Sequence, residues 1–328
     1  MFGFGFSGSF NPAKDIPDLS GKVILVTGGK YSLEISKHGT CVLISHTGNA
    51  GLGTETIKQL AAHNPQEISL TSRSEEKAKN AIKEIRDVVP NARVTHLPLD
   101  LTDFASISQA AKTFQSASSR LDILINNAGV MAMPYSKTSQ GYEIQFGTNH
   151  MGHALFTKLL LPTLLETASQ PGADVRVVNL SSYGHNLAPG GGIIWDQDKA
   201  EQISTNARYG GSKLANILHA RILGEKYPQI TAVAVHPGVI MTELYASVKK
   251  GTAARYVLGA VAPLVFASTQ DGAKTTLWAA TAPKESVQRD YYFEPIGKAG
   301  CASKNAKDHD LAVKLWDWTE EELKKHGY

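Results

Sequence analysis

The amino-acid sequence predicts an α/β fold built on a single doubly wound parallel sheet with helices on both faces. Two observations lead to this prediction. From Gly21 onward, short apolar runs alternate with amphipathic stretches, and this alternation requires crossover connections that cover both faces of a mostly parallel sheet. In addition, residues suited to ligand binding follow several of the apolar runs, where the carboxyl ends of parallel strands form a binding edge.

The apolar runs are the expected strands, and the stretches between them are the expected helices. Strands are expected at Val23–Thr27, Glu67–Ser72, Arg93–Leu97, Leu121–Asn126, Asp174–Leu180 and Ile230–His236. Helices are expected at Gly53–His63, Glu75–Val89, Phe104–Ser116, Tyr142–Ser169 and Tyr209–Tyr227. Ser74 marks the start of the second helix, because a hydroxyl caps free backbone N–H groups and the acidic residues after it suit the positive first turn.

Composition limits the classes of protein to consider. The 328 residues contain no repeat, no linker rich in Gly and Ser and no break in composition, so we expect a flexible tail at residues 1–18 and a single domain at 19–328. A net charge of +3 gives no reason to expect nucleic acid as a partner. Two cysteines imply no disulfide framework and fit the cytoplasm. No apolar run reaches the roughly 20 residues that span a bilayer.

A glycine turn of the kind that binds phosphate is split in two. The first expected strand ends in Thr27-Gly28-Gly29, and Asn49-Ala50-Gly51-Leu52-Gly53 leads into the first expected helix. Removing Lys30–Gly48 joins the halves as VTGGNAGLG. Glycines in such a turn let the backbone approach a pyrophosphate at the N-terminus of the next helix. The candidate cofactor-binding residues here are Gly28, Gly51, Leu52 and Gly53.

The ends of the next strands indicate which dinucleotide is bound. An acidic residue after the second strand would bind the ribose hydroxyls of NAD, but Ser72 and Arg73 stand there. Because a guanidinium pairs well with phosphate, Arg73 favours the 2′-phosphate of NADP(H). Asp100 follows the third strand and either accepts a hydrogen bond from the adenine amino group or caps the next helix. Asn127 follows the fourth strand.

Residues suited to acid–base chemistry follow the fifth strand and lie in the last expected helix. Ser181 and Ser182 end the strand, and Tyr209 and Lys213 open the helix. The YxxxK spacing places the phenol and the ammonium on one helix face, where the cation lowers the tyrosine pKa toward working pH. The paired histidines of HMGH, at 150 and 153, have no adjacent glutamate and no obvious third ligand, so we expect no metal site and interpret both as packed or solvent-facing.

Seven motifs together resemble the short-chain dehydrogenase/reductase family over nearly the whole chain from Leu19. They are TGG…NAGLG, DLTD, NNAG, the asparagine of GTNHMGH, LSS, YGGSK and HPGVIMT. The segments LSSYGH, YGGSKLANILHAR and DGAKTTLWAAT look like the branch of retinol dehydrogenases and WW-domain oxidoreductases, with many fungal relatives. The resemblance implies a Rossmann-type fold and an NADP(H)-dependent enzyme that interconverts a carbonyl (ketone or aldehyde) and an alcohol.

The resemblance also implies a role for each matching residue. Tyr209 is the general acid/base, Ser182 binds the reacting oxygen, and Lys213 lowers the tyrosine pKa and holds the nicotinamide ribose. Asn149 anchors a water that relays protons to the lysine. Asn127 would line the cofactor groove, and Val239 and Thr242 would hold the nicotinamide carboxamide. An apolar small-molecule substrate, a role in fungal secondary metabolism and a homodimer through the helices of Asn149 and Tyr209 are further implications.

The interruption at Lys30–Gly48 allows three explanations. It is a tolerated surface loop; or CVLISHTGNAGLG, from Cys41, replaces the first strand and turn; or it is a retained intron, which we favour because codons for Gly29-Lys30-Tyr31 can contain the donor consensus GTAAGT. An alternative function follows, namely a catalytically impaired or non-catalytic nucleotide-binding relative. The apolar segment Tyr256–Phe266 is interpreted as a lid, an interfacial patch or core.

Overall fold

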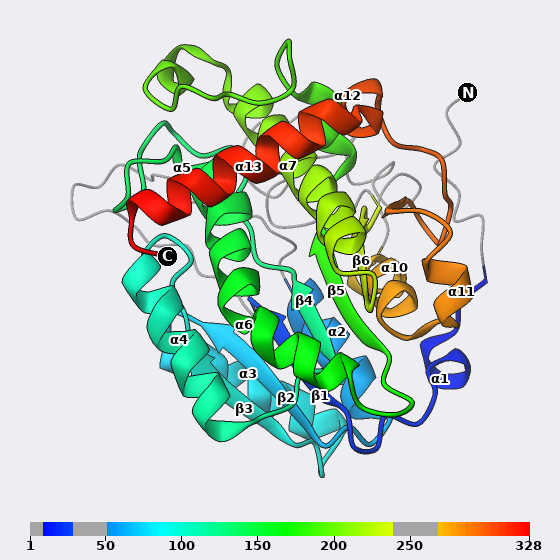
Figure 1. The fold of residues 1–328 in the computed structure, drawn as a ribbon. Coiled ribbons are helices and arrows are strands. Elements are labelled where there is room, and N and C mark those ends of the chain that lie inside the picture. The colour runs from blue at the N-terminus through cyan, green and yellow to red at the C-terminus, as the bar shows by residue number, and fades with distance from the viewer. Residues whose placement is uncertain (1–8, 29–50, 239–267) are drawn as a thin grey trace, which may run out of the picture.

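A single parallel sheet organises the chain. The computed structural model describes residues 9–28, 51–238 and 268–328. Within these ranges seven strands pair in the order β3-β2-β1-β4-β5-β6-β7, all parallel (Figure 1). The strands are β1 Val23–Thr27, β2 Glu67–Ser72, β3 Val94–Pro98, β4 Ile123–Asn126, β5 Val175–Leu180, β6 Ile230–Val235 and β7 Tyr292–Phe293. The predicted doubly wound parallel sheet is confirmed.

Helices follow nearly every strand. They are α1 Pro12–Asp15, α2 Leu52–Ala61, α3 Glu75–Val88, α4 Phe104–Ala117, α5 Ile144–Phe146, η1 Gly147–Met151, α6 Gly152–Ala168, η2 Tyr183–Leu187, η3 Lys199–Gln202, α7 Thr205–Lys226, α10 Thr269–Thr281, α11 Lys284–Val287, α12 Lys304–Lys307 and α13 His309–Lys325. Among the described residues, none of these helices combines the length and the apolar composition needed to cross a membrane.

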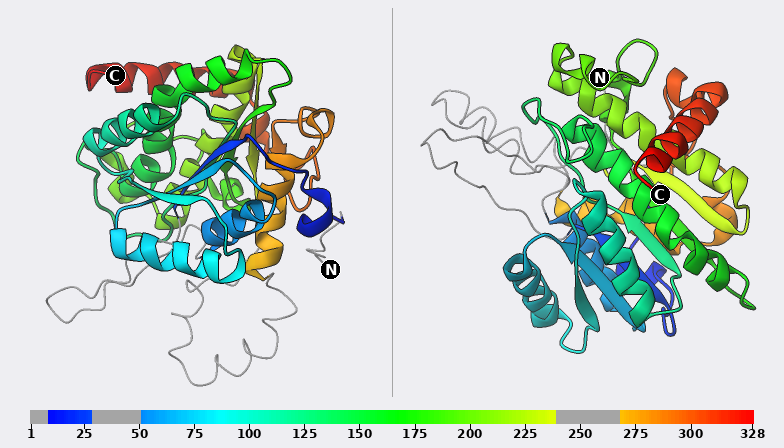
Figure 2. Two further views of the ribbon diagram at one scale, coloured as in Figure 1. Left: turned by 90° about the horizontal axis from the view of Figure 1, so that it is seen from below. Right: turned by 60° about the vertical axis from the view of Figure 1, so that its left-hand side comes forward.

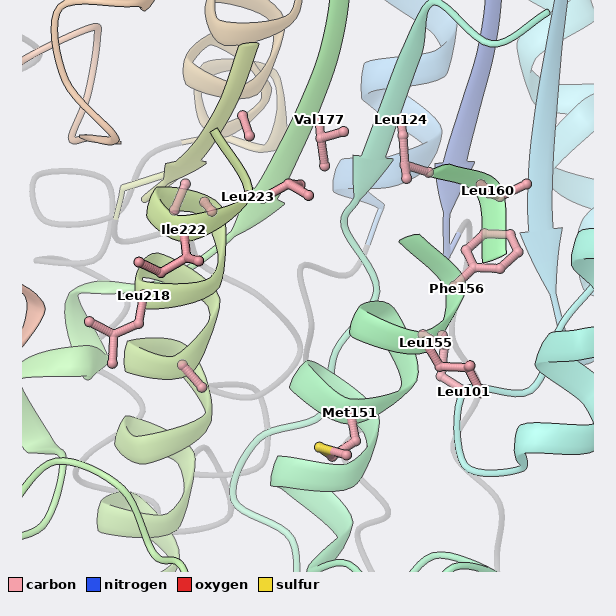
Figure 3. Packing of buried hydrophobic residues seen from close by; sticks show 14 of the residues in the cluster. Leu101, Leu124, Met151, Leu155, Phe156, Leu160, Val177, Leu218, Ile222 and Leu223 are labelled. Carbon is pink, nitrogen blue, oxygen red and sulfur yellow. The ribbon is translucent and has the colours of Figure 1, made fainter. Parts of the chain in front are cut away.

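The core has two halves, one on each face of the sheet. Strand residues alternate between them: Leu25 joins the cluster under α4, α6 and α7, whereas Ile24 joins the cluster under α2, α3 and α10. Figure 3 shows part of the first cluster, to which α6 contributes Leu155 and α7 contributes Leu218. Because each residue of a central strand faces one helical layer or the other, a strand such as β1, VILVT, is buried along its whole length.

The strand order reverses between β1 and β4. From β1 the chain proceeds outward through β2 and β3, and from β4 it proceeds outward through β5 and β6 on the other side (Figures 1 and 2). The crossovers therefore diverge at this point. Sheets of this kind bind ligands in a crevice outside the carboxyl ends of the strands where the order reverses, here β1 and β4.

The expected strands lie within two residues of the observed ones, but several helices differ. Ser204, whose side chain accepts from the N–H of Ala207, starts α7 at Thr205, so Tyr209 lies inside the helix rather than opening it. The expected helix at 142–169 is divided, because a π-helical turn, η1, separates α5 from α6. The four C-terminal helices and β7 were not expected.

Part of the expected N-terminal tail is packed against the body of the protein. Asn11 caps α1 by accepting from the N–H of Ala13. Phe10 and Ile16 are buried in the half of the core that contains α10. Residues 9–18 thus differ from a loose tail because two apolar side chains on either side of a capped turn are removed from water.

Helix α13 lies outside α7 and α6 and crosses both (Figures 1 and 2). Trp316 stacks on His219 of α7 at 5.2 Å between ring centroids, and Thr319 lies 3.0 Å from His150. Glu320 forms an ion pair with Lys158 of α6. The C-terminus of the same chain therefore covers the outer face of α7 and also contacts η1 and α6.

Candidate active site

The two described halves of the glycine turn meet in space. A Cβ atom on Gly53 would lie 1.9 Å from the carbonyl oxygen of Gly28, so only glycine fits. Gly51 caps α2 with a φ of 82°, which also favours glycine. Gly28 and Gly51–Gly53 therefore bring the end of β1 to the N-terminus of α2 and form a cradle of the kind that holds a pyrophosphate.

One explanation of the interruption is wrong. Val23–Thr27 is the strand between β2 and β4, so Cys41–Ser45 does not supply the first strand. Residues 29–50, which include the interruption Lys30–Gly48, lie outside the described residues, as do Val239, Thr242 and the segment Tyr256–Phe266.

Asn127 joins the carboxyl ends of β1 and β4. Its backbone N–H donates to the hydroxyl of Thr27, and its side-chain amide donates to the carbonyl oxygens of Thr27 and Gly28 at 2.8 and 3.1 Å. Asn127 Oδ1 is buried and has no hydrogen-bond partner in the described structure. This unpaired acceptor at the crevice fits a polar ligand, because buried polar atoms are nearly always satisfied.

Arg73 and Asp100 lie together at the ends of β2 and β3. The guanidinium is 3.9 Å from the carboxylate, and both side chains are partly exposed. Asp100 accepts from the backbone N–H and the hydroxyl of Thr102. Asp103, not Asp100, caps α4, so the alternative role of Asp100 as that cap is wrong.

Ser182 and Tyr209 flank Gly184. A Cβ atom on Gly184 would lie 2.8 Å from Cε1 of Tyr209 and 3.3 Å from Oγ of Ser182. The absence of a side chain there lets the phenol ring and the hydroxyl approach each other. Ser182 Oγ accepts from the N–H of Gly184 at 3.0 Å, which leaves the serine proton available to a ligand. Ser181 instead donates to the carbonyl of Lys213 and is buried.

Lys213 is buried beside Tyr209 on α7. Its Nζ lies 5.8 Å from the centre of the tyrosine ring and donates to the carbonyl of Leu180 at 2.9 Å. Burial disfavours the charged form and lowers the pKa of Lys213 to about 7. The lysine can therefore lose or gain a proton near neutral pH.

Asn149 lies on the π-helical turn η1 and faces Lys213. A Cβ atom on Gly129 would lie 2.9 Å from Asn149 Oδ1 and 3.2 Å from Lys213 Nζ. The Asn149 side chain accepts from the N–H of Val130 and donates to the carbonyl of Val130 and the hydroxyl of Ser212. The side chain is thus fully engaged, and the backbone carbonyl of Asn149 lies 3.0 Å from Nδ1 of His153.

The structure shows polar residues that sequence reasoning did not assign to the site. Thr27 accepts from the N–H groups of Asn127 and Ala128. His153 bridges Thr27 and Asn149, and His185 contacts the carbonyl of Ser182 at 2.7 Å. His153 was expected to pack or face solvent, and it packs. Its position four residues after Asn149 on a helix was the available signal. The described residues hold no group of three His, Cys, Asp or Glu able to bind a metal.

Comparisons with known proteins identify relatives along nearly the whole chain. The family described as short chain dehydrogenase matches residues 41–194. The chain is 38% identical over 323 residues to the short-chain dehydrogenase/reductase drtF of Aspergillus calidoustus, with 94% of this chain and 96% of that protein covered. It is 37% identical over 295 residues to retinol dehydrogenase 12 of Mus musculus, with 88% of each covered.

Among solved structures, that of an uncharacterized protein from Mycobacterium paratuberculosis superposes with a TM-score of 0.69 at 27% identity. The superposition covers 97% of this chain and 98% of that one.

Proposed function

This chain belongs to the short-chain dehydrogenase/reductase family of oxidoreductases, and from this premise we propose that it interconverts a carbonyl group and an alcohol with NADP(H). The observation that carries the proposal is the approach of Ser182 and Tyr209 to each other at Gly184, with Lys213 beside the Tyr209 ring, at the carboxyl edge of the sheet. A nicotinamide dinucleotide, when bound, supplies or accepts the hydride.

Side chains of this protein supply the proton and stabilise the charge that develops on the reacting oxygen. In the direction of reduction, the Tyr209 hydroxyl gives its proton to the carbonyl oxygen, and Ser182 donates a hydrogen bond to the same oxygen. Protonated Lys213 favours the phenolate that remains. In the direction of oxidation the same groups act in reverse, with the phenolate accepting the alcohol proton. Asn149 holds the proton relay to Lys213.

The cofactor would be held along the crevice. The backbone of Gly28, Gly51, Leu52 and Gly53 and the N-terminus of α2 suit the pyrophosphate. Asn127 stabilises this turn through its hydrogen bonds to the carbonyl oxygens of Thr27 and Gly28, and the Asp100 carboxylate suits the adenine amino group. Lys213 and Tyr209 would hold the nicotinamide ribose, and we assign the carboxamide to Val239 and Thr242.

Arg73 selects NADPH over NADH. Its guanidinium lies 3.9 Å from the Asp100 carboxylate at a partly exposed site, and such ion pairs contribute little. A 2′-phosphate offers a stronger, charge-assisted bond of about 1.5–3 kcal/mol. In Arg73→Ala, kcat/KM with NADPH should therefore fall at least tenfold while kcat/KM with NADH changes little. Equal use of both cofactors by the wild type would remove this assignment.

The surface beside Ser182 supports an apolar substrate. Tyr183 and Leu187 of η2 are 49% and 55% exposed, unusually high for large apolar side chains in this protein. Both follow the residue that would hold the reacting oxygen. We therefore expect activity toward ketones and aldehydes to rise with the size of the apolar substituent. A cytoplasmic location and a role in secondary metabolism belong to the same proposal.

The test is turnover by purified protein with NADPH and a panel of ketones and aldehydes. Tyr209→Phe should abolish turnover but leave the NADPH dissociation constant nearly unchanged, because only the phenol oxygen is lost. Lys213→Ala should damage both, since the ammonium has two roles. Retention of most of kcat by Tyr209→Phe would refute the mechanism. A wild-type protein that binds NADPH but turns over nothing would favour the non-catalytic alternative.

A further inference from the structure

His153 connects two parts of the site that come from different strands and helices. It is the second residue of α6 and is 4% exposed. Its Nδ1 lies 3.0 Å from the backbone carbonyl oxygen of Asn149, and its Nε2 lies 2.8 Å from the hydroxyl oxygen of Thr27. One imidazole thus spans the end of β1 and the π-helical turn η1.

The partners of His153 fix which ring nitrogen carries the proton. A carbonyl oxygen only accepts, so Nδ1 must donate to Asn149. The Thr27 hydroxyl already accepts from the N–H groups of Asn127 and Ala128, which fills both lone pairs, so it must donate its own proton to Nε2. The two deductions agree. Burial lowers the pKa of His153 to about 3, which keeps the ring neutral at working pH.

At one end of this bridge, His153 orients the Thr27 hydroxyl. The only other acceptor near that proton, in the described structure, is the carbonyl of Ile125 at 3.5 Å, beyond good hydrogen-bond length. With the proton directed to His153, the Thr27 lone pairs face the loop after β4. That loop carries Asn127, whose amide in turn holds the carbonyl of Gly28. The glycine turn and the loop after β4 therefore depend on the orientation of one hydroxyl.

At the other end, His153 holds the carbonyl of Asn149. The side chain of Asn149 is already bonded to Val130 and Ser212. We therefore assign the proton relay to its carbonyl oxygen, which has two lone pairs and accepts from His153 through one of them. In η1 the backbone bond from Gly152 N–H goes to Gly147, five residues back, and such π turns shift carbonyl directions. The imidazole N–H fixes this carbonyl where the regular helical pattern is interrupted.

We propose that His153 is a positioning residue that locks the relay carbonyl of Asn149 to the cofactor-binding turn through Thr27. The proposal rests on the proposed function, because the relay matters only if Lys213 and Tyr209 exchange protons during turnover. His153 touches neither substrate nor reacting atoms. It acts by orienting two hydrogen-bond partners, the Thr27 hydroxyl at the end of β1 and the Asn149 carbonyl on η1.

Three variants separate the two ends of the bridge. In His153→Asn the amide nitrogen replaces Nδ1, so the bond to Asn149 is kept and the bond to Thr27 is lost. In His153→Gln the amide oxygen replaces Nε2, so the bond to Thr27 is kept and the bond to Asn149 is lost. His153→Leu loses both. The measurements are the NADPH dissociation constant by fluorescence, kcat with the best ketone of the panel, and the solvent deuterium isotope effect on kcat.

We expect opposite defects in the two variants that each lose one hydrogen bond. His153→Asn should keep kcat within about threefold but weaken NADPH binding at least fivefold. His153→Gln should keep NADPH binding within about twofold but lose at least tenfold in kcat, with a larger solvent isotope effect. His153→Leu should show both defects. Three outcomes would overturn the proposal. In the first, kcat and NADPH affinity fall together in all three variants and follow their melting temperatures. In the others, the kinetics of all three variants are unchanged, or none of the three folds.

Failure of the proposed function gives a different pattern. If the wild type binds NADPH but turns over nothing, the relay has no reaction to serve and the proposed function fails. The bond to Thr27 is then still tested by NADPH binding alone, where His153→Gln should match the wild type and His153→Asn should not.

Discussion

At the scale of single residues, the site depends on glycines that make room for other side chains. Gly184 separates Ser182 from the Tyr209 ring, and Gly129 separates Asn149 from Lys213. In each place a methyl group would lie under 3 Å from an atom of a candidate catalytic residue. The geometry of the site is thus set as much by absent side chains as by those present.

Gly184→Ala should impair catalysis without abolishing folding. The new Cβ would push the Tyr209 ring, which it approaches to 2.8 Å, away from Ser182. We expect kcat to fall at least tenfold, a barrier change of about 1.4 kcal/mol, while NADPH binding stays within about threefold. Gly190→Ala is the matched control, because nothing lies within 4 Å of its added Cβ. An unchanged kcat in Gly184→Ala would contradict the arrangement described here.

Sequence reasoning located the residues whose spacing is local and missed those whose partners are distant. Tyr209 and Lys213 are four apart on one helix, so their proximity follows from the helical period. Thr27 and His153, by contrast, are 126 positions apart, and only the closed sheet brings them together. No periodicity in the chain encodes such a contact.

At the scale of elements, strands buried on both faces were predictable and short C-terminal elements were not. The five residues of β1 are all buried, and this continuous apolar run is visible in the sequence. β7 has only two residues, too few for any period to appear. The position of the first strand was ambiguous for a related reason. The family match begins at residue 41, and CVLISHTGNAGLG has the sequence pattern of a strand and turn. The sheet nevertheless uses Val23–Thr27.

Deleting Lys30–Gly48 should improve cofactor binding. The deletion joins Gly29 to Asn49 and restores an uninterrupted glycine turn between Gly28 and Gly51, whose surroundings already meet in space. We expect NADPH to bind at least tenfold more tightly, about 1.4 kcal/mol, and the yield of purified protein to rise. The measurement is fluorescence titration of both forms. Equal affinity would make the segment a harmless loop and weaken the retained-intron hypothesis, which sequencing of the transcript tests directly.

At the scale of the whole molecule, buried neutral histidines make stability depend on pH. Burial lowers the pKa of His153 and His236 to about 3 and that of His219 to about 4, whereas an unfolded histidine titrates near 6.5. Below about pH 6.5 the unfolded chain therefore binds protons that the folded chain does not. Stability should fall as pH falls from about 6.5 toward about 3–4.

Urea unfolding at pH 7.5 and 5.0 measures this effect. Each of the three histidines should contribute a loss of up to about 2 kcal/mol at pH 5.0. In His219→Asn the amide oxygen can still accept from Asn179, which now bonds to Nδ1, but the titrating group is gone. The variant should therefore lose less stability on acidification than the wild type. An identical pH dependence would show that His219 is not neutral in the fold.

The expected homodimer through α6 and α7 conflicts with the position of α13. That face is occupied by Trp316, Thr319 and Glu320 of the same chain. We therefore predict a monomer of 35.3 kDa by light scattering at micromolar concentration. A dimer whose cross-links join α6 and α7 of two chains would show that α13 leaves its place.

That residues 19–328 form one domain remains a prediction.

The position of α13 also has a consequence for synthesis on the ribosome. α7 is complete at Lys226, but the helix that covers it begins only at His309 and is therefore translated later. At about 5–20 residues per second, the 17 residues of α13 take about one to three seconds to make. Until then the nascent chain displays the face around His219 and His150 to chaperones and proteases. A frameshift or stop codon before His309 would leave that face uncovered permanently, so α13 matters to the survival of the protein as much as any strand of the sheet.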